Sequence, residues 1–451
     1  MKYSSLIRIF FFLFYSLLIT SCEGDNKPEV YEEGSNKYTN DWIYKQMKKY
    51  YKWNETLPDK GDLSLNSKEY FSRLLQKDDI YSYAIHPELP QTAPQSIRTK
   101  YGFDLSFIEF QGKFYGVILY VLYDSPAKNN GLSRGQLITK INGSELNVVN
   151  YNNLYKSIIA SSNLDLEIIS YSAQSGFSDS KEISLLQGYT FGQPINYKVI
   201  EEKSTKIGYI EIPHFDVGQA QLFLQILQEL KSKSIRELVL DLRYNGGGDI
   251  SSATALSIIV APNIQSNNLF IKFEGNANGG NVDQSFLQAL QSNESKVSFE
   301  ALRNAHPFIN RIYVLCGNRT ASASELIINN LKPYMDVITI GEKTFGKDVA
   351  GFPIEDDRIS GKRGWVLYLS IYKLFNARHE GNYSKGINPV MAANELQEPE
   401  VFPLGSTSEV LLKQALNAIS GNTSKMKTAT LRSLPLSTIY TDVDPLLPFT
   451  P

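Results

Sequence analysis

The chain is poor in residues on which several common chemistries depend. Only two cysteines and four histidines occur in 451 residues. Cys22 directly follows an apolar N-terminal run, so Cys316 has no partner for a structural disulfide, and we expect a buried thiol there. No cluster of His, Cys, Asp and Glu has metal-ligand spacing in the sequence. We therefore expect neither a metal nor an organic cofactor.

The chain also lacks an excess of charge and a second long apolar run. Forty-five Lys and Arg residues face 47 Asp and Glu residues, for a formal net charge of −2. This balance gives no indication of a nucleic-acid partner. Beyond the N-terminus, no apolar run is long enough to span a bilayer. Any membrane attachment is therefore expected through an N-terminal lipid alone.

The N-terminus has the pattern of an export signal. Residues 1–21 carry basic residues followed by an apolar core, which is typical of a secretory signal peptide. The end of this segment resembles a bacterial lipobox, which implies that Cys22 is lipidated and that residues 22–39 form a tether. The alternative is a plain signal peptide with an incidental Cys22. The expected location is the bacterial cell envelope, at its periplasmic face or on the cell surface.

About 430 residues follow the signal, enough for roughly three domains, and their patterns predict a multidomain α/β protein. Residues 40–95 place aromatic residues at helical spacing and end in a proline-containing linker, which predicts a small helical N-terminal domain. Residues 96–190 have a strand pattern with short helices, and residues 191–421 alternate strands with helices in βαβ units. Residues 422–451 are predicted to form a loosely ordered tail, to which we assign no function.

One strand, loop, helix and strand unit dominates the last third of the chain. Residues 312–316 are an apolar run typical of a buried strand, and a helix is predicted to begin near Ser322. Residues 336–340 form the next predicted strand. Strands joined by a helical crossover lie parallel, so the loop before Ser322 is expected at the carboxyl edge of a sheet, where α/β folds place their sites.

This placement gives Ser322 a chemical interpretation. The amide of Ala323, in the first turn of the helix, could hold an oxyanion that forms when the Ser322 hydroxyl attacks a carbonyl. No histidine lies in the unit, but Lys347 follows its second strand and can act as a base if burial lowers its pKa. The ordinary alternatives are a helix N-cap role for Ser322 and a first-turn carboxylate role for Glu325.

Two segments of this unit carry a family resemblance. Residues 322–325 read S-A-S-E and residues 341–347 read G-E-K-T-F-G-K. This pattern resembles the C-terminal processing peptidases, or tail-specific proteases, which are serine proteases with a Ser–Lys dyad. The resemblance implies that Ser322 is the nucleophile, Lys347 the general base and Ala323 one half of the oxyanion hole. Many members carry a glutamine where this chain has Gly351, so another group, with Glu325 as one candidate, is expected to orient Lys347.

The segment Asp241 to Gly248 resembles the family's D-L-R-x-N-x-G-G turn. The resemblance implies that this turn supplies the second oxyanion N–H, from either Gly247 or Gly248. A phosphate-binding loop is the alternative use of such glycines, but no Lys–Ser/Thr pair follows them. His214, just after a predicted strand, leaves open a Ser-His-Asp arrangement.

Residues 125–143 resemble the PDZ signature, with Gln136 in place of the usual aspartate. A PDZ domain binds a peptide C-terminus as an added strand and holds its carboxylate on backbone amides. The resemblance places that carboxylate site at Tyr101, Gly102, Phe103 and Asp104, and a groove-lining helix at residues 150–161. The alternative is a module that serves only for packing or gating.

These patterns together predict an exported, lipid-anchored serine endopeptidase that cleaves proteins or peptides. The PDZ domain is expected to receive the substrate C-terminus. The alternative from another class is a catalytically weak, protease-like scaffold that binds peptides or glycans. The sequence leaves the oligomeric state and the substrate open.

Overall fold

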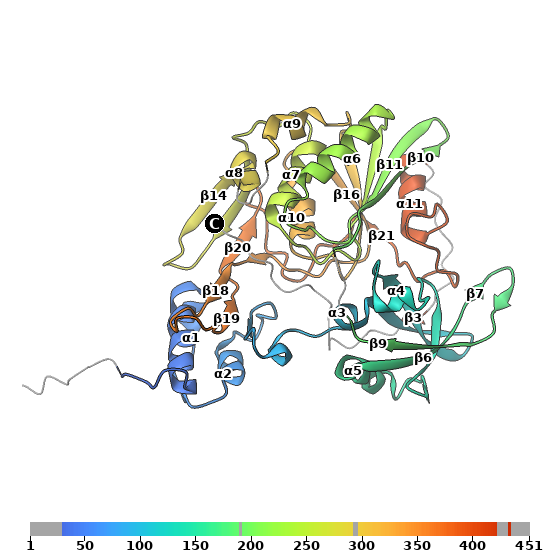
Figure 1. Ribbon diagram of the computed structural model, residues 1–451. Helices are drawn as coiled ribbons and strands as arrows, with labels where there is room; N and C mark the ends of the chain where they lie inside the picture. The colour runs from blue at the N-terminus through green and yellow to red at the C-terminus, as the bar shows by residue number, and fades with distance from the viewer. Residues whose placement is uncertain (1–28, 189–191, 292–295, 422–431, 434–451) are drawn as a thin grey trace, which may run out of the picture.

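The computed structural model describes residues 29–188, 192–291, 296–421 and 432–433 (Figure 1). The predicted signal peptide and Cys22 lie outside the described residues. Within the described ranges, no helix combines the length and the apolar character that crossing a membrane requires.

A six-stranded sheet forms the largest part of the molecule. The strand order is β10-β11-β12-β15-β16-β21; β11 to β21 run parallel and β10 pairs antiparallel with β11. The predicted parallel pair around the serine loop is confirmed as β15 and β16. The strands are β10 (Asn196–Glu202), β11 (Thr205–Glu211), β12 (Glu237–Asp241), β15 (Arg311–Cys316), β16 (Asp336–Gly341) and β21 (Met391–Ala392).

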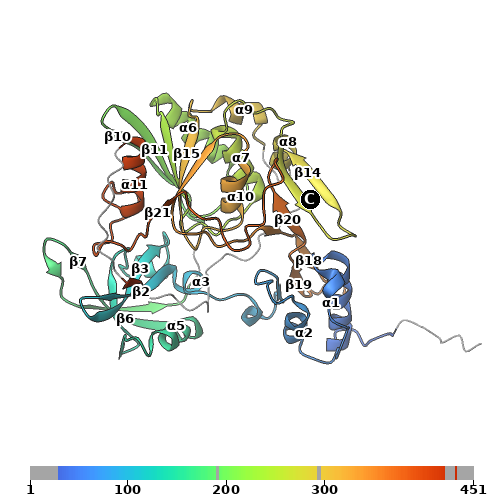
Figure 2. The same ribbon diagram turned by 180° about the vertical axis from the view of Figure 1, so that it is seen from behind.

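Helices cover both faces of this sheet because its strands are apolar on both sides. Leu238 and Leu240 of β12 belong to the cluster that contains the apolar residues of α6, α7 and α10, whereas Val239 belongs to the cluster that contains α11. Figures 1 and 2 show α6, α7 and α10 on one side of the sheet and α11 on the other. The helices are α6 (Ala220–Ser232), α7 (Ile250–Val260), α9 (Phe299–Asn304), α10 (Ala323–Asn330) and α11 (Val410–Ile419).

The N-terminal helices share the hydrophobic core of the large sheet. Trp42 of α1 and Phe71 of α2 belong to the same buried cluster as α7 and α10, so the helical N-terminal region packs on the core of the large sheet. Helix α1 spans Asn36–Tyr50 and α2 spans Ser67–Leu74. The Ser35 side chain caps α1 by accepting a hydrogen bond from Tyr38 N. Helix α1 thus begins four residues before the boundary at residue 40 that the sequence analysis placed between tether and helical region.

Two smaller sheets complete the core. The first, β1-β19-β18, pairs the end of the N-terminal region with a late hairpin. The second has the order β14-β13-β20-β17. Their elements are β1 (Tyr83–Ile85), β13 (Leu269–Glu274), β14 (Asn281–Ser285), α8 (Phe286–Gln291), β17 (Val349–Ala350), β18 (Pro353–Glu355), β19 (Val366–Tyr368) and β20 (Tyr372–Phe375).

Residues 97–186, here called the small module, have their own sheet and their own hydrophobic cluster. The sheet order is β22-β2-β3-β4-β6-β9, and β5 pairs with β4. Its elements are α3 (Ile97–Tyr101), β2 (Phe103–Phe110), β3 (Lys113–Val121), α4 (Pro126–Asn129), β4 (Leu137–Ile141), β5 (Ser144–Glu145), α5 (Tyr151–Ala160), β6 (Asn163–Ile169), β7 (Tyr171–Ser172), β8 (Gly176–Phe177) and β9 (Lys181–Leu186).

The outermost strand of this sheet comes from the C-terminal tail. Strand β22 (Arg432–Ser433) pairs antiparallel with β2, where the sequence predicted only a loosely ordered tail. The prediction missed this strand because two polar residues give no strand periodicity. The pairing partner lies more than 300 residues earlier in the chain.

Candidate active site

Ser322 occupies the junction of the β15 loop and α10 in a strained conformation. Its φ of 55° and ψ of −116° lie outside the regions that non-glycine residues ordinarily adopt, at a cost of about 1–3 kcal/mol. Among residues 320–331 it is the only one that is not fully buried. Helix α10 begins at the next residue, so the Ala323 amide has no acceptor within the helix. The serine is thus held at the surface beside an amide that can bind an anion.

Glu325 joins the serine to the loop that carries Lys347. This side chain is completely buried. Its Oε2 accepts hydrogen bonds from the backbone N–H of Ser322 at 3.0 Å and of Lys347 at 2.8 Å. Its Oε1 accepts from Thr344 Oγ1 at 2.5 Å and from Gly346 N at 2.7 Å. Glu325 therefore fixes the two segments relative to each other through their backbones.

Burial raises the pKa of Glu325 to about 7, against the opposing effect of the four hydrogen bonds that it accepts. The prediction of an ordinary first-turn carboxylate does not fit this environment, since the side chain contacts a loop 20 residues further on. The carboxylate contacts the backbone of both predicted catalytic residues and is a positioning residue in this geometry.

Lys347 lies in the loop after β16 and is only 3% exposed. The loop is attached to the serine loop by a hydrogen bond of 2.9 Å from Phe345 N to Thr320 O. On its other side, Thr344 N donates to Ile387 O at 3.1 Å and Ile387 N donates to Thr344 Oγ1 at 2.7 Å. The lysine is thus buried in a loop that is fixed on both sides.

The surroundings of Gly351 explain why this chain does not carry the glutamine that many family members have at this position. A Cβ atom on this residue would lie 2.0 Å from Leu369 O, a backbone atom that cannot move aside cheaply. No glutamine side chain fits there without a shift of the backbone. The orientation of Lys347 must therefore come from other contacts, and the Glu325 bond to its N–H is one of them.

The glycine turn after β12 lies directly against the serine. A Cβ atom on Gly247 would lie 2.6 Å from Ser322 Cβ and 3.0 Å from Ala323 N. The Gly247 N–H donates to Asn245 Oδ1 at 2.8 Å, whereas no bond from the Gly248 N–H occurs among the described residues. The turn therefore lies beside the Ala323 amide, and of the two glycines Gly248 has the amide that is available for a ligand.

Asn245 is a site residue that our sequence analysis did not single out. Its side chain is fully buried and its Nδ2 donates to Ile212 O at 3.0 Å. Its backbone O accepts from Ala321 N and from Ser324 Oγ, both at 3.1 Å. Asn245 thus connects the glycine turn with the serine loop. The sequence signal that could have pointed to Asn245 is its position as the asparagine of the D-L-R-x-N-x-G-G pattern.

His214 lies on the other side of the same turn. A Cβ atom on Gly248 would lie 2.8 Å from His214 Cε1, and His214 Nδ1 lies 2.9 Å from Asp216 Oδ1. The turn therefore has Ser322 packed against one glycine and a His–Asp pair against the next. The Ser-His-Asp arrangement that the sequence left open stays an alternative.

The four predicted peptide-binding residues, Tyr101, Gly102, Phe103 and Asp104, are all buried at the start of β2. Gly102 has φ 81° and caps α3, and its N–H donates to Arg98 O at 2.9 Å. Asp104 forms an ion pair with Arg98. The Gly102 N–H is thus already used in a hydrogen bond within α3. A peptide carboxylate would have to bind to the N–H groups of neighbouring residues instead.

This corner of the small module contacts both loops of the candidate active site. Arg98 Nη1 donates to Tyr244 O at 2.9 Å, just before the glycine turn. Arg319 Nη2, in the serine loop, donates to Leu105 O of β2 at 3.1 Å. A second contact is made by Arg134, whose guanidinium pairs with Glu395 at 2.7 Å. Charged side chains therefore join the module to the core, together with a buried apolar cluster in which Tyr120 stacks on Tyr244.

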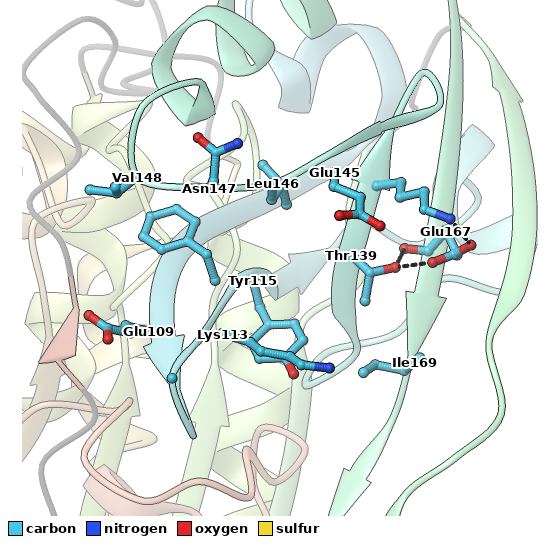
Figure 3. Close-up of a pocket in the computed structure, with 13 residues that line it drawn as sticks. Glu109, Lys113, Tyr115, Thr139, Glu145, Leu146, Asn147, Val148, Glu167 and Ile169 are labelled. Carbon is cyan, nitrogen blue, oxygen red and sulfur yellow. Dashed lines mark hydrogen bonds and ion pairs between the residues drawn. The ribbon is translucent and has the colours of Figure 1, made fainter.

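The module also carries a cavity with a volume of about 740 Å³ (Figure 3). It lies between β3, β4, β6 and the 145–148 loop, and none of the predicted site residues lines it. On its wall, Thr139 Oγ1 donates to Glu167 Oε1 at 2.6 Å. Among the described residues, no group of three or more His, Cys, Asp or Glu side chains is placed to hold a metal.

A strained serine at a helix start, beside the first helical amide and a glycine turn, defines a site of the serine-hydrolase class. Residues 206–392 match Peptidase family S41, and residues 38–83 match the Peptidase S41 N-terminal domain. The chain belongs to peptidase family S41. This confirms the family resemblance that the two catalytic motifs carried.

Relatives and solved structures agree with this assignment. The carboxy-terminal processing protease CtpA of Bacillus subtilis (strain 168) is 26% identical over 317 residues, which cover 70% of this chain and 61% of that protein. A candidate S41 protease from Bacteroides fragilis NCTC 9343 has a solved structure with TM-score 0.69 and 26% identity, covering 88% of this chain and all of that one. The photosystem II D1 C-terminal processing protease, at 17% identity and TM-score 0.50, shares the fold over 85% of this chain and 98% of its own.

Proposed function

We propose that this chain is an exported serine endopeptidase of the carboxy-terminal processing type, attached to the cell envelope through a lipid on Cys22. The observation that carries the catalytic part is the Glu325 carboxylate, which holds the backbones of Ser322 and Lys347 together. This bridge is what we expect if Ser322 and Lys347 act together on one substrate. The anchoring part is supported only by the sequence around Cys22.

In the proposed reaction, Lys347 accepts the Ser322 hydroxyl proton while Ser322 Oγ attacks the scissile carbonyl. The negative charge on the carbonyl oxygen is held by the Ala323 amide and an amide of the glycine turn, for which the free Gly248 N–H is the better candidate. The proton then passes from Lys347 to the leaving amine, and water completes hydrolysis of the acyl-enzyme. The strained φ of Ser322 supports this role, because such strain is common at nucleophiles.

The small module is proposed to receive the substrate C-terminus along β2. The backbone at the start of β2 and the neighbouring α5 give the arrangement that strand addition needs, because Tyr101 Oη donates to Ser161 O at 2.8 Å and holds the helix end there. The substrate would then be an unfolded or flexible protein terminus. A packing role for the module is the alternative.

Kinetics on the chain without residues 1–22 test the catalytic proposal. Ser322→Ala and Lys347→Ala should each lower peptide hydrolysis by roughly 10⁴-fold while the circular dichroism spectrum and melting temperature stay close to those of the wild type. His214→Ala is the matched comparison and should retain activity. Near wild-type hydrolysis by Lys347→Ala, together with its loss in His214→Ala, would move the base role to the histidine and contradict the proposal.

A further inference from the structure

The outer edge of β2 is occupied by the chain's own C-terminal segment. In β22, Arg432 lies opposite Glu109 and Ser433 opposite Ile108, in antiparallel register. On its other side, β2 pairs with β3 along its whole length, so β22 lies on the opposite edge of β2, where it pairs with two of the strand's eight residues. Figure 2 shows this segment as a short red stretch beside β2. Part of the tail is thus bound to the module by backbone pairing.

The same edge faces the helix that would line a peptide groove. Phe107 of β2 packs against Tyr151 of α5 with ring centroids 5.2 Å apart, and against Tyr155 at 6.4 Å. At the other end, Lys100 Nζ donates to Ser161 O at 2.6 Å. Helix α5 therefore runs beside β2 from Phe107 back to the α3 cap. A peptide that adds to β2 would lie between these two elements.

Chain direction makes β22 a direct competitor for such a peptide. Because β22 is antiparallel to β2, the step from Arg432 to Ser433 leads from Glu109 toward the start of β2. A substrate that adds antiparallel to β2, with its C-terminus near residues 101–104, would run in the same direction and pair with the same backbone groups at Ile108 and Glu109. An edge strand has only one free row of N–H and C=O groups, so the two cannot bind together.

We infer that the tail around Arg432–Ser433 is an intramolecular strand ligand of the small module that competes with substrate C-termini for β2. About a dozen residues separate β22 from the end of α11, so covalent attachment keeps the tail at a high effective concentration near β2. The competition rests on the proposed function, whereas the strand pairing does not.

Hydrogen exchange tests the pairing by itself. The Ser322→Ala chain, residues 23–451, is compared with the same chain carrying Arg432→Pro and Ser433→Pro, which removes two backbone donors from β22. A matched control carries Ser437→Pro and Thr438→Pro, outside the described strand. Backbone amides in residues 106–110 should exchange faster in the first variant than in the control. Equal exchange in all three chains would overturn the proposal.

Binding then tests the competition. The probe is a fluorescein-labelled peptide that ends in a free leucine carboxylate, measured by fluorescence anisotropy against the same three chains and a chain that ends at residue 421. Loss of β22 should tighten binding by about tenfold, as expected when a tethered competitor is removed. A synthetic peptide of residues 424–441 should compete with the probe on the shortened chain.

The outcomes separate the two proposals. Faster exchange in residues 106–110 without any change in probe affinity would leave the strand pairing in place and overturn the competition. No probe binding to any chain, together with faster exchange, would contradict the proposed role of the module in substrate recognition and not the pairing. Equal affinity and equal exchange would remove the whole inference.

Discussion

The candidate active site and the small module are attached to the core in different ways. Around Ser322, three loops are joined by hydrogen bonds to backbone groups, and the buried Glu325 carboxylate accepts from three backbone N–H groups and from the Thr344 hydroxyl. The module instead meets the core through side chains, namely the guanidinium groups of Arg98, Arg134 and Arg319 and a buried apolar cluster in which Tyr120 stacks on Tyr244. Hydrogen bonds to backbone groups leave little freedom of movement, whereas side chains have rotatable bonds that allow small movements. The contrast suggests a rigid chemical centre and an adjustable binding module.

Among variants that test this comparison, the largest effect is expected from Glu325→Gln, which disturbs the hydrogen bonds that hold the chemical centre. In Glu325→Gln one oxygen is replaced by an NH₂ group that faces backbone N–H donors, so we expect kcat to fall by roughly 10²–10³-fold. The pH dependence sharpens the test. With a pKa of about 7, wild-type Glu325 takes up a proton as the pH falls through neutrality and loses an acceptor, so kcat/KM should fall there.

Protonation of Glu325 also makes the free energy of unfolding depend on pH. Its folded pKa lies above the ordinary value of 4.5, so the folded state binds the proton more tightly. The stabilisation is complete below about pH 4.5 and is lost as the pH rises through about 7, an effect on the order of 3 kcal/mol. Glu211, whose pKa burial also raises to about 7, is the control. Glu211→Gln should remove a similar stability slope while the pH profile of kcat/KM stays unchanged; a changed profile would argue against Glu325 as its source.

The second largest effect is expected at Gly351. Gly351→Gln restores the residue that many family members carry, yet its Cβ would collide with Leu369 O. We expect a loss of about 2–3 kcal/mol in unfolding free energy, measured by urea denaturation, and no gain in activity. Gly192→Gln, at an exposed glycine whose Cβ position has only an ordinary contact with Asp216 Oδ2 at 3.8 Å, is the control for adding this side chain. An active, fully stable Gly351→Gln chain would show that the loop adapts.

The smallest effect is expected at the contact between Arg319 and the small module. Arg319→Ala removes the hydrogen bond to Leu105 O and should cost about 1–2 kcal/mol of unfolding free energy, with less than about threefold change in hydrolysis of a short peptide. Arg303→Ala, on the exposed face of α9, should cost under about 0.5 kcal/mol. A fall in hydrolysis of about 100-fold or more in Arg319→Ala would show that the module contact controls the chemical centre. That result would contradict the difference we draw between the two regions.

The sequence predicted those parts whose signals are local. The β15, α10 and β16 unit follows from apolar periodicity and from a serine before the helix, and its order is confirmed. The role of Glu325 could not be predicted, because its partners Thr344, Gly346 and Lys347 come from a loop whose position only the tertiary fold sets. The steric reason for Gly351 was equally hidden, since it depends on Leu369 in another segment. Strand β22 left no local pattern at all.

The three-stranded sheet β1-β19-β18 has a consequence for how the chain folds. Tyr83 pairs with Tyr368, so the N-terminal helices cannot complete their contacts until nearly the whole core has been synthesised. At about 5–20 residues per second, the roughly 280 intervening residues take on the order of 15–60 s. Contacts of such high sequence separation also slow folding itself. Closure of this sheet is therefore expected to be a late step, after synthesis of the core.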